Sequence, residues 1–278
     1  MKLGEFELHI VSDGSFRLDG GAMFGIVPRT LWERHVDVDE KNRVRLALNC
    51  LYVRTPGHQV LIDTGIGNKF DAKWNVIYDV DRSQTLVGSL ARLGVRPEDI
   101  DTIIHTHLHF DHAGGNTTQL SDGRIVRTFP NACCYAQQGE FDHALAPFDR
   151  DRPSYALDRA KFMPPYCEYE LLQGDQEVVP GIRVAVKPGH NRFMQIVEIE
   201  SQGEKGIVFS DLVSTQFHLN PQWITSFDLF PLEVIENKRP LIEDALREHW
   251  LCVFYHDMQC PMGFLAEQRG KIVAEPPA

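Results

Sequence analysis

Long apolar runs are missing from this chain of 278 residues. No stretch of about 18 consecutive apolar residues occurs, so we expect no transmembrane helix. Residues 1–11 alternate apolar and polar side chains like a β-strand, and they lack the apolar core of a signal peptide. We therefore expect a cytoplasmic protein that has no membrane partner.

Cysteine and positive charge are also scarce. The 6 cysteines form no Cys-x-x-Cys pair and no dense framework, which favours reduced thiols that serve packing. Lys and Arg number 28 against 39 Asp and Glu, and the resulting formal net charge of −11 argues against nucleic acid as a partner. Nothing in the sequence supports a homo-oligomer, although none is excluded.

The composition is that of a globular protein, with 43% hydrophobic and 24% charged residues. No repeat or linker-like run divides the chain, so we expect one domain over residues 1–278. Apolar residues at helical spacing predict helices over residues 83–93 and 233–250, the second interrupted by Pro240. Apolar strand patterns between them favour a layered α/β architecture.

The most informative pattern lies in residues 103–115, which read Ile-Ile-His-Thr-His-Leu-His-Phe-Asp-His-Ala-Gly-Gly. The apolar, β-branched start predicts a buried strand, and the small residues at the end predict a tight loop. On an extended strand end, His107 and His109 point to the same side, where both imidazoles can bind one cation. Asp111 and His112 follow where the chain turns, and they can approach the same space from another direction. This short segment can therefore serve two neighbouring metal ions.

The His-x-His-x-Asp-His pattern resembles the signature of the metallo-β-lactamase-fold hydrolases. The resemblance implies an α/β fold in the form of a four-layer αββα sandwich, which holds one or two metal ions between its halves. It also implies three further ligands in order: a His after a Gly turn, an Asp at a strand end and a late His. The sequence offers His190 after Pro-Gly, Asp211 after one apolar strand and His256 after another.

By this resemblance, seven residues form a site for two divalent metal ions. The first ion would be held by His107, His109 and His190, the second by Asp111, His112 and His256, and Asp211 would bridge the two. We expect Zn²⁺, although Fe or Mn could occupy the same ligands. Two cations about 3.5–4 Å apart can share a water and lower its pKa toward roughly 7. Asp111 and Asp211 are the predicted catalytic residues, and Asp111 could also pass a proton to the leaving group.

Several residues are predicted to support this site or to bind substrate. The resemblance places Asp63, in an Asp-Thr-Gly turn, beside the metals, where it can orient a ligand imidazole; the alternative is a simple turn residue. Residues 137–170 carry aromatic side chains among charges and prolines, and they predict short helices that form a lid or substrate wall. The predicted substrate pocket, for which ordinary packing or a surface loop is the alternative, comprises Met23, Phe24, Trp32, Phe217, His218 and Trp223.

The ligand set, the Met-Phe-Gly-Ile-Val-Pro segment and the length look closest to the branch that contains acyl-homoserine lactonases and organophosphate hydrolases. Asp211 counts against β-lactam cleavage, because the zinc β-lactamases that share this signature generally lack an aspartate there. We therefore predict hydrolysis of a small-molecule ester or lactone, with phosphoester or thioester cleavage as the alternative. One departure is Ser214, which stands where the well-known lactonases carry a Tyr that orients the carbonyl. His218 or another Tyr would have to substitute for that phenol.

Two other functional classes remain open at this point. A persulfide dioxygenase shares the fold but uses a single iron held by two His and an Asp. A non-catalytic member of the family would bind metal and hydrolyse nothing. Metal content and a broad substrate panel separate these alternatives from a dinuclear hydrolase.

Overall fold

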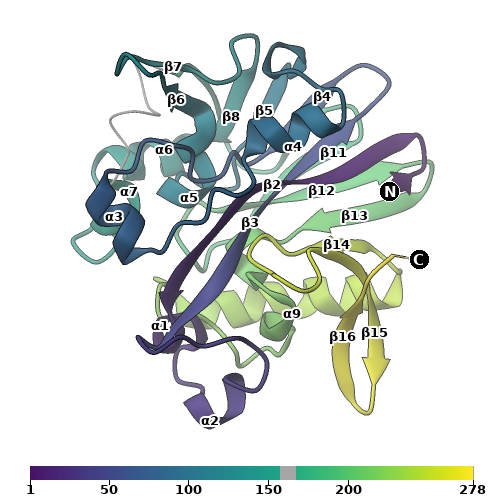
Figure 1. Ribbon diagram of the computed structural model, residues 1–278. Coiled ribbons are helices and arrows are strands. Elements are labelled where there is room, and N and C mark those ends of the chain that lie inside the picture. The colour runs from purple at the N-terminus through teal and green to yellow at the C-terminus, as the bar shows by residue number, and fades with distance from the viewer. Residues whose placement is uncertain (157–166, 278) are drawn as a thin grey trace.

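Two seven-stranded mixed sheets form the centre of the computed structural model, which describes residues 1–156 and 167–277 (Figure 1). The first sheet contains, in spatial order, β1 (Lys2–Leu3), β2 (Phe6–Asp19), β3 (Arg43–Arg54), β4 (Gln59–Ile62), β5 (Thr102–Ile104), β8 (Cys133–Gln137) and β9 (Tyr169–Leu172). The second contains β10 (Gln176–Val179), β11 (Ile182–Val186), β12 (Gln195–Ser201), β13 (Glu204–Val208), β14 (Leu251–Val253), β15 (Met262–Gln268) and β16 (Lys271–Glu275). A separate hairpin pairs β6 (Thr117–Gln119) with β7 (Ile125–Arg127).

The inner faces of the two sheets share one apolar layer. From the first sheet, Val60 and Ile62 of β4 enter this layer, and from the second sheet Val197 of β12 and Val253 of β14 do so. Successive side chains on a strand point to opposite faces, so the apolar strands β5, β13 and β14 also supply residues to the outer faces. Such strands are apolar on both sides because both of their faces are covered.

Helices cover the two outer faces and complete the four layers. On the first sheet, Leu86 and Leu90 of α4 (Leu86–Arg92) pack into an apolar cluster that includes Leu61 and Ile103. On the second, α9 (Pro231–Arg247) packs into a cluster with Ile207 and Cys252. Figure 1 shows α9 along one side of the sandwich and α4 along the other. The predicted αββα sandwich is confirmed.

The remaining helices are short and lie near the ends of the strands. They are α1 (Gly20–Phe24), α2 (Arg29–Trp32), α3 (Ala72–Ile77), α5 (Phe110–Ala113), α6 (Gln138–Leu145) and α7 (Arg152–Ala156), with 3-10 turns η1 (Pro97–Asp99), η2 (Gly114–Asn116), η3 (Ser210–Val213) and η4 (Gln216–Leu219). No helix in the described ranges combines the length and apolarity needed to cross a membrane.

Two helix predictions differ from the structure. The helix predicted over residues 233–250 begins earlier and runs unbroken through Pro240, which lies exposed within α9. Packing of the apolar face holds this helix together although proline removes one backbone hydrogen bond. The helix predicted over residues 83–93 is shorter and runs from Leu86 to Arg92.

The segment predicted as a lid or wall, residues 137–170, contains α6, α7 and the start of β9. Its residues 157–166 lie outside the described part of the chain. Pro153 and Ser154 of α7 line the cavity described below, so this part of the segment forms a wall there. A closing movement of the segment stays a prediction.

Candidate metal centre

The segment that follows β5 places four polar side chains beyond the carboxyl end of this strand. His107 and His109 lie on extended backbone beyond the strand, and α5 then turns Asp111 and His112 toward them. All four side chains are almost completely buried. Gly115 permits this tight path, because an added Cβ would overlap the Thr64 carbonyl oxygen of the neighbouring turn.

The other three predicted ligands come from separate strand ends of the second sheet. His190 follows β11, Asp211 lies in η3 after β13, and His256 follows β14. In three overlapping groups, the ligand atoms lie within 4.8 Å of one another: His107, His109 and His190; His107, His112 and Asp211; Asp111, His112 and His256. The fold therefore brings all seven predicted residues into one centre.

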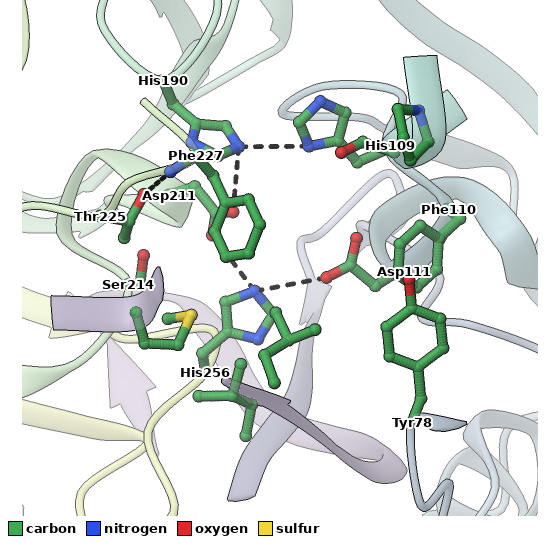
Figure 2. Close-up of a pocket in the computed structure, with 15 residues that line it drawn as sticks. Tyr78, His109, Phe110, Asp111, His190, Asp211, Ser214, Thr225, Phe227 and His256 are labelled. Atoms are coloured by element: carbon green, nitrogen blue, oxygen red, sulfur yellow. Dashed lines mark hydrogen bonds and ion pairs between the residues drawn. The ribbon is translucent and has the colours of Figure 1, made fainter. Parts of the chain in front are cut away.

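Asp211 lies between the two groups, with one carboxylate oxygen directed to each (Figure 2). Its Oδ2 is 3.3 Å from Nε2 of His190 and 3.9 Å from Nε2 of His107. Its Oδ1 is 3.3 Å from Nε2 of His256 and 3.6 Å from Nε2 of His112. On the second side, Oδ2 of Asp111 is 3.6 Å from the same His256 nitrogen. This is the arrangement that a carboxylate bridging two cations requires.

Several ligand atoms at the centre make no hydrogen bond in the described part of the chain. The buried atoms without a hydrogen bond there include Nε2 of His107, Nε2 of His112 and Oδ1 of Asp211. Buried polar atoms are otherwise almost always paired, because losing water without a replacement costs about 1–3 kcal/mol per group. Nδ1 of His109 and Nε2 of His190 face each other at 3.2 Å. Imidazole and carboxylate atoms arranged in this way fit two divalent cations, and the residues present can hold them.

The opposite nitrogen of several imidazoles is held by a fixed acceptor. Asp63 Oδ2 lies 2.9 Å from Nδ1 of His112, and Asp228 Oδ1 lies 2.9 Å from Nδ1 of His190. The backbone carbonyl of Ala47 accepts from Nδ1 of His256 at 2.9 Å. These contacts leave Nε2 of each ring facing the centre, which is how proteins orient metal-binding histidines. Asp63 therefore lies where the resemblance placed it.

The local backbone at the centre is strained. Asp63 and Ser210 have φ values of 56° and 51°, in the left-handed region that residues with a Cβ seldom adopt. Asp63 accepts hydrogen bonds from the backbone N–H and the hydroxyl of Thr106, and Ser210 donates to the same hydroxyl oxygen. These buried contacts hold the strained turns in place beside the ligands.

The electrostatics of the centre favour positive charge. Burial lowers the pKa of His107 and His109 well below the ordinary value, so both rings are neutral and able to bind a cation. Burial would raise the pKa of Asp211, but His256, His112 and His190 hold it well below its usual range. Burial raises the pKa of Asp111, and the nearby charge of Asp211 opposes its ionisation further. The two carboxylates are thus suited to different tasks.

A cavity of about 100 Å³ opens onto the metal-binding residues. His109, Asp111, His190, Asp211 and His256 form its polar floor. Its walls are mainly apolar and come from strands β2 and β3, short helices and loops, with Leu18, Met23, Leu46, Tyr78, Phe110, Pro153 and Phe227. Figure 2 shows the labelled members of this set around the polar floor. Ser214 and Thr225 place hydroxyl-bearing side chains on the wall near Asp211. The site can therefore hold a small molecule with one polar, reactive end and an apolar remainder.

Of the six residues predicted for the substrate pocket, Met23 lines this cavity. Phe24 and Trp32 are buried and stack on each other with ring centroids 5.0 Å apart. Trp223 packs edge-on against Phe24. Neither Trp32 nor Trp223 lines this cavity, and each ring packs against Phe24 instead, as the packing alternative predicts.

His218 and Phe217 border a second, adjacent cavity that shares His256 and Met23 with the first. Both ring nitrogens of His218 are engaged, Nδ1 with Thr215 Oγ1 at 2.8 Å and Nε2 with the Met23 carbonyl oxygen at 2.9 Å. Burial and the nearby Lys238 lower the pKa of His218 to about 4. His218 therefore fixes the loop that carries Met23, and it does not replace the phenol absent at Ser214.

Sequence reasoning missed Asp228, Glu140 and Tyr78. Asp228 lies in a largely apolar stretch, and only its isolated charge there could have pointed to a buried role. Glu140 Oε1 accepts from the backbone N–H of Leu108, which lies between two ligands, and burial raises its pKa to about 7. Tyr78 lies about thirty residues before the ligand segment, and no pattern around it indicates a place in the site.

Comparison with known proteins agrees with this geometry. The model of the metallo-beta-lactamase superfamily matches residues 44–232. An N-acyl homoserine lactonase from Bacillus cereus is 28% identical over 233 residues, which cover 80% of this chain and 86% of that protein. A crystal structure of a probable metal-dependent hydrolase from Staphylococcus aureus superposes with a TM-score of 0.90 at 31% identity, covering 100% of both chains.

A more distant structure shares the fold. The dizinc quorum-quenching lactonase AidC, in complex with a product, superposes with a TM-score of 0.80 at 22% identity and covers 100% of this chain and 96% of its own. The predicted family and the predicted hydrolase class are confirmed. The chain belongs to the metallo-beta-lactamase superfamily.

Proposed function

We propose that the protein hydrolyses a lactone or a related carboxylic ester of a small molecule with an apolar acyl part. The observation that carries the proposal is the position of Asp211, whose two oxygens face two separate groups of ligands. The relatives named as N-acyl homoserine lactonases support a lactone as the first substrate class to test. The apolar walls of the cavity support an acyl chain next to the reacting bond.

Two divalent ions, for which we propose zinc, would be held by the seven residues and, when bound, would polarise the acyl oxygen and lower the pKa of a water between them. Asp211 stays a carboxylate at neutral pH, since three histidines stabilise its charge. Asp111 takes the proton that the attacking water loses and delivers it to the leaving oxygen. The water oxygen joins the acyl carbon, the carbon–oxygen bond breaks, and a hydroxy acid leaves.

The apolar wall makes the acyl chain a determinant of affinity. Leu18, Met23, Leu46 and Phe227 supply apolar side chains to this wall. Each methylene group buried against such a wall contributes about 0.8 kcal/mol, which is roughly a fourfold gain in kcat/KM. We expect kcat/KM to rise with acyl chain length until the chain fills the cavity.

The test is a substrate panel on protein whose metal content has been measured. N-acyl homoserine lactones of increasing chain length, simple γ-lactones, alkyl esters, thioesters and phosphotriesters are compared by acid release. We expect two metal ions per chain and the highest kcat/KM on lactones. His107→Ala and His256→Ala, one from each ligand group, should each remove one ion and most of the activity.

Three results would contradict the proposal. Faster cleavage of phosphotriesters than of any lactone or ester would assign the site to phosphoester chemistry. One iron per chain with oxygen uptake on a thiol substrate would indicate a dioxygenase. Two bound metals with no hydrolysis across the panel would indicate a non-catalytic member of the superfamily.

A further inference from the structure

Tyr78 places a phenol on the cavity wall beside Asp111. It follows α3 directly and lines the cavity together with Phe110 and Asp111. Figure 2 shows its ring with the hydroxyl end directed toward these two residues. Burial raises the pKa of Tyr78, and the negative charge of Asp111 raises it further, so the phenol keeps its proton at neutral pH.

Neighbouring rings hold the Tyr78 ring in one orientation. The ring centroids of Phe110, Trp74 and Phe70 lie 5.5, 5.8 and 6.0 Å from it, and Phe16 packs edge-on at 6.3 Å. The Tyr78 backbone N–H donates to the Trp74 carbonyl at 2.9 Å. A hydroxyl on a ring packed in this way loses little freedom when it binds a ligand, which favours a defined role.

The other phenols near the centre are already engaged. The Tyr155 hydroxyl donates to Glu140 at 2.9 Å, and the Tyr255 hydroxyl donates to the backbone carbonyl of Asp111 at 2.7 Å. Across residues 1–156 and 167–277, Tyr78 is the only tyrosine that lines the cavity, and its hydroxyl makes no hydrogen bond to the protein there. It is therefore free to donate to a bound molecule.

The position of the Tyr78 hydroxyl determines which substrate atom it can contact. Asp111 is the group that returns a proton to the leaving oxygen, and Tyr78 lies on the same side of the cavity. Ser214 and Thr225 lie on the other side, near Asp211. We propose that the Tyr78 hydroxyl donates a hydrogen bond to the leaving oxygen of the substrate, next to Asp111; this inference rests on the proposed ester or lactone hydrolysis.

The hydrogen bond acts as the carbon–oxygen bond breaks. The bonding pair moves onto the leaving oxygen, the proton taken from water by Asp111 ends on that oxygen, and Tyr78 keeps its own proton. A donor that meets charge only as it develops raises kcat more than it lowers KM. Its benefit is large for an alkoxide and small for a thiolate, because sulfur is a weak hydrogen-bond acceptor.

The experiment compares an N-acyl homoserine lactone with the thiolactone that differs only in the ring heteroatom. For Tyr78→Phe, we expect kcat on the lactone to fall roughly 10- to 100-fold with KM little changed. The loss on the thiolactone should stay below about threefold. Tyr52→Phe is the matched control and should change neither rate, because it removes a hydroxyl in β3 that donates to Gln59 of β4, away from the cavity.

Metal content and thermal melting are measured on each variant. The Phe ring keeps the packing of Tyr78, and Tyr78→Leu, which removes that packing as well, should show the same selective loss on the lactone. Equal losses on lactone and thiolactone, or no loss on either, would overturn the role of Tyr78 while leaving the hydrolase proposal intact. A wild-type enzyme that opens neither ring and cleaves no ester would overturn both.

Discussion

The two halves of the sandwich supply the metal centre in different ways. The first half provides four of the seven ligands from the six residues 107–112, on one strand end and one short helix. The second half provides His190, Asp211 and His256 from three separate strand ends. The first set is defined by local chain geometry, whereas the second set converges only after the second sheet has formed.

The position of His256, the last ligand along the chain, depends on contacts with both halves. His256 belongs to the second half, yet the Ala47 carbonyl of β3 accepts from its Nδ1. Asn49 of β3 donates through its side chain to the carbonyls of Phe254 and Asp257, at 3.2 and 2.8 Å. The loop that carries His256 is thus anchored on the first sheet, so the second metal group forms only where the two sheets meet.

The largest effect is expected where both groups meet, at Asp211. Asp211→Asn keeps the size of the side chain but removes the negative charge that lies between His190 and His256. We expect binding of both metal ions to weaken and kcat/KM to fall by about 1,000-fold or more. Metal analysis after gel filtration and lactone-opening rates measure the two effects on the same sample.

The control for this variant is Asp122→Asn in the exposed turn between β6 and β7, which should leave metal content and rate unchanged. If Asp211→Asn kept two ions and the wild-type rate, Asp211 would not bridge the groups. The two halves would then differ only in how the chain brings the ligands together, and Asp211 would not link the two ligand groups.

The ligands themselves were predictable from sequence because each lies where an apolar strand ends. His190 after Pro-Gly and Asp211 after an apolar strand are local signals, and their order along the chain matched the resemblance. Asp228 carries no such signal, although it holds His190 from 38 residues away. Side chains that orient ligands across the fold depend on tertiary packing, and one sequence does not encode that contact in any local pattern.

The substrate wall was less predictable than the ligands. Phe24 and Trp32 were predicted to line the substrate pocket, with packing as the alternative, but Phe24 stacks on both Trp32 and His218. Large aromatic rings gain more by burying one another than by lining a wet cavity. The cavity instead takes Tyr78 and Phe227 from segments whose spacing indicated nothing.

An effect of intermediate size is expected on the pH dependence of the free energy of unfolding, through His218 in the second half. The pKa of His218 is lowered to about 4, so between pH 6.5 and pH 4 the unfolded chain binds a proton there that the folded chain does not. The free energy of unfolding should therefore decrease as the pH falls through this window, by up to about 3 kcal/mol. Urea denaturation of metal-free protein at several pH values measures the slope.

His218→Asn removes the titrating group while keeping a polar side chain for Thr215 and Met23. We expect a flatter pH dependence of stability between pH 6.5 and 4 than in the wild type. Asn131→Ser, at an exposed residue without an ionisable side chain, is the control and should keep the wild-type slope. An unchanged slope in His218→Asn would show that acid sensitivity does not originate in this loop of the second half.

The smallest effect is expected from the two aspartates that orient a ligand imidazole, Asp63 in the first half and Asp228 in the second. Asp63 holds His112 and also accepts two hydrogen bonds from Thr106, whereas Asp228 holds His190 and accepts from the Thr225 backbone. We expect Asp63→Asn and Asp228→Asn to weaken metal affinity roughly 10- to 100-fold. Asp63→Asn should also lower the free energy of unfolding, because its strained turn depends on these contacts, and Asp228→Asn should lower it less. Competition with a chelator measures the metal affinity of both variants, and urea titration measures their free energies of unfolding. Equal losses of stability in the two variants would contradict the idea that the ligands of the first half depend on local chain geometry more than those of the second half do.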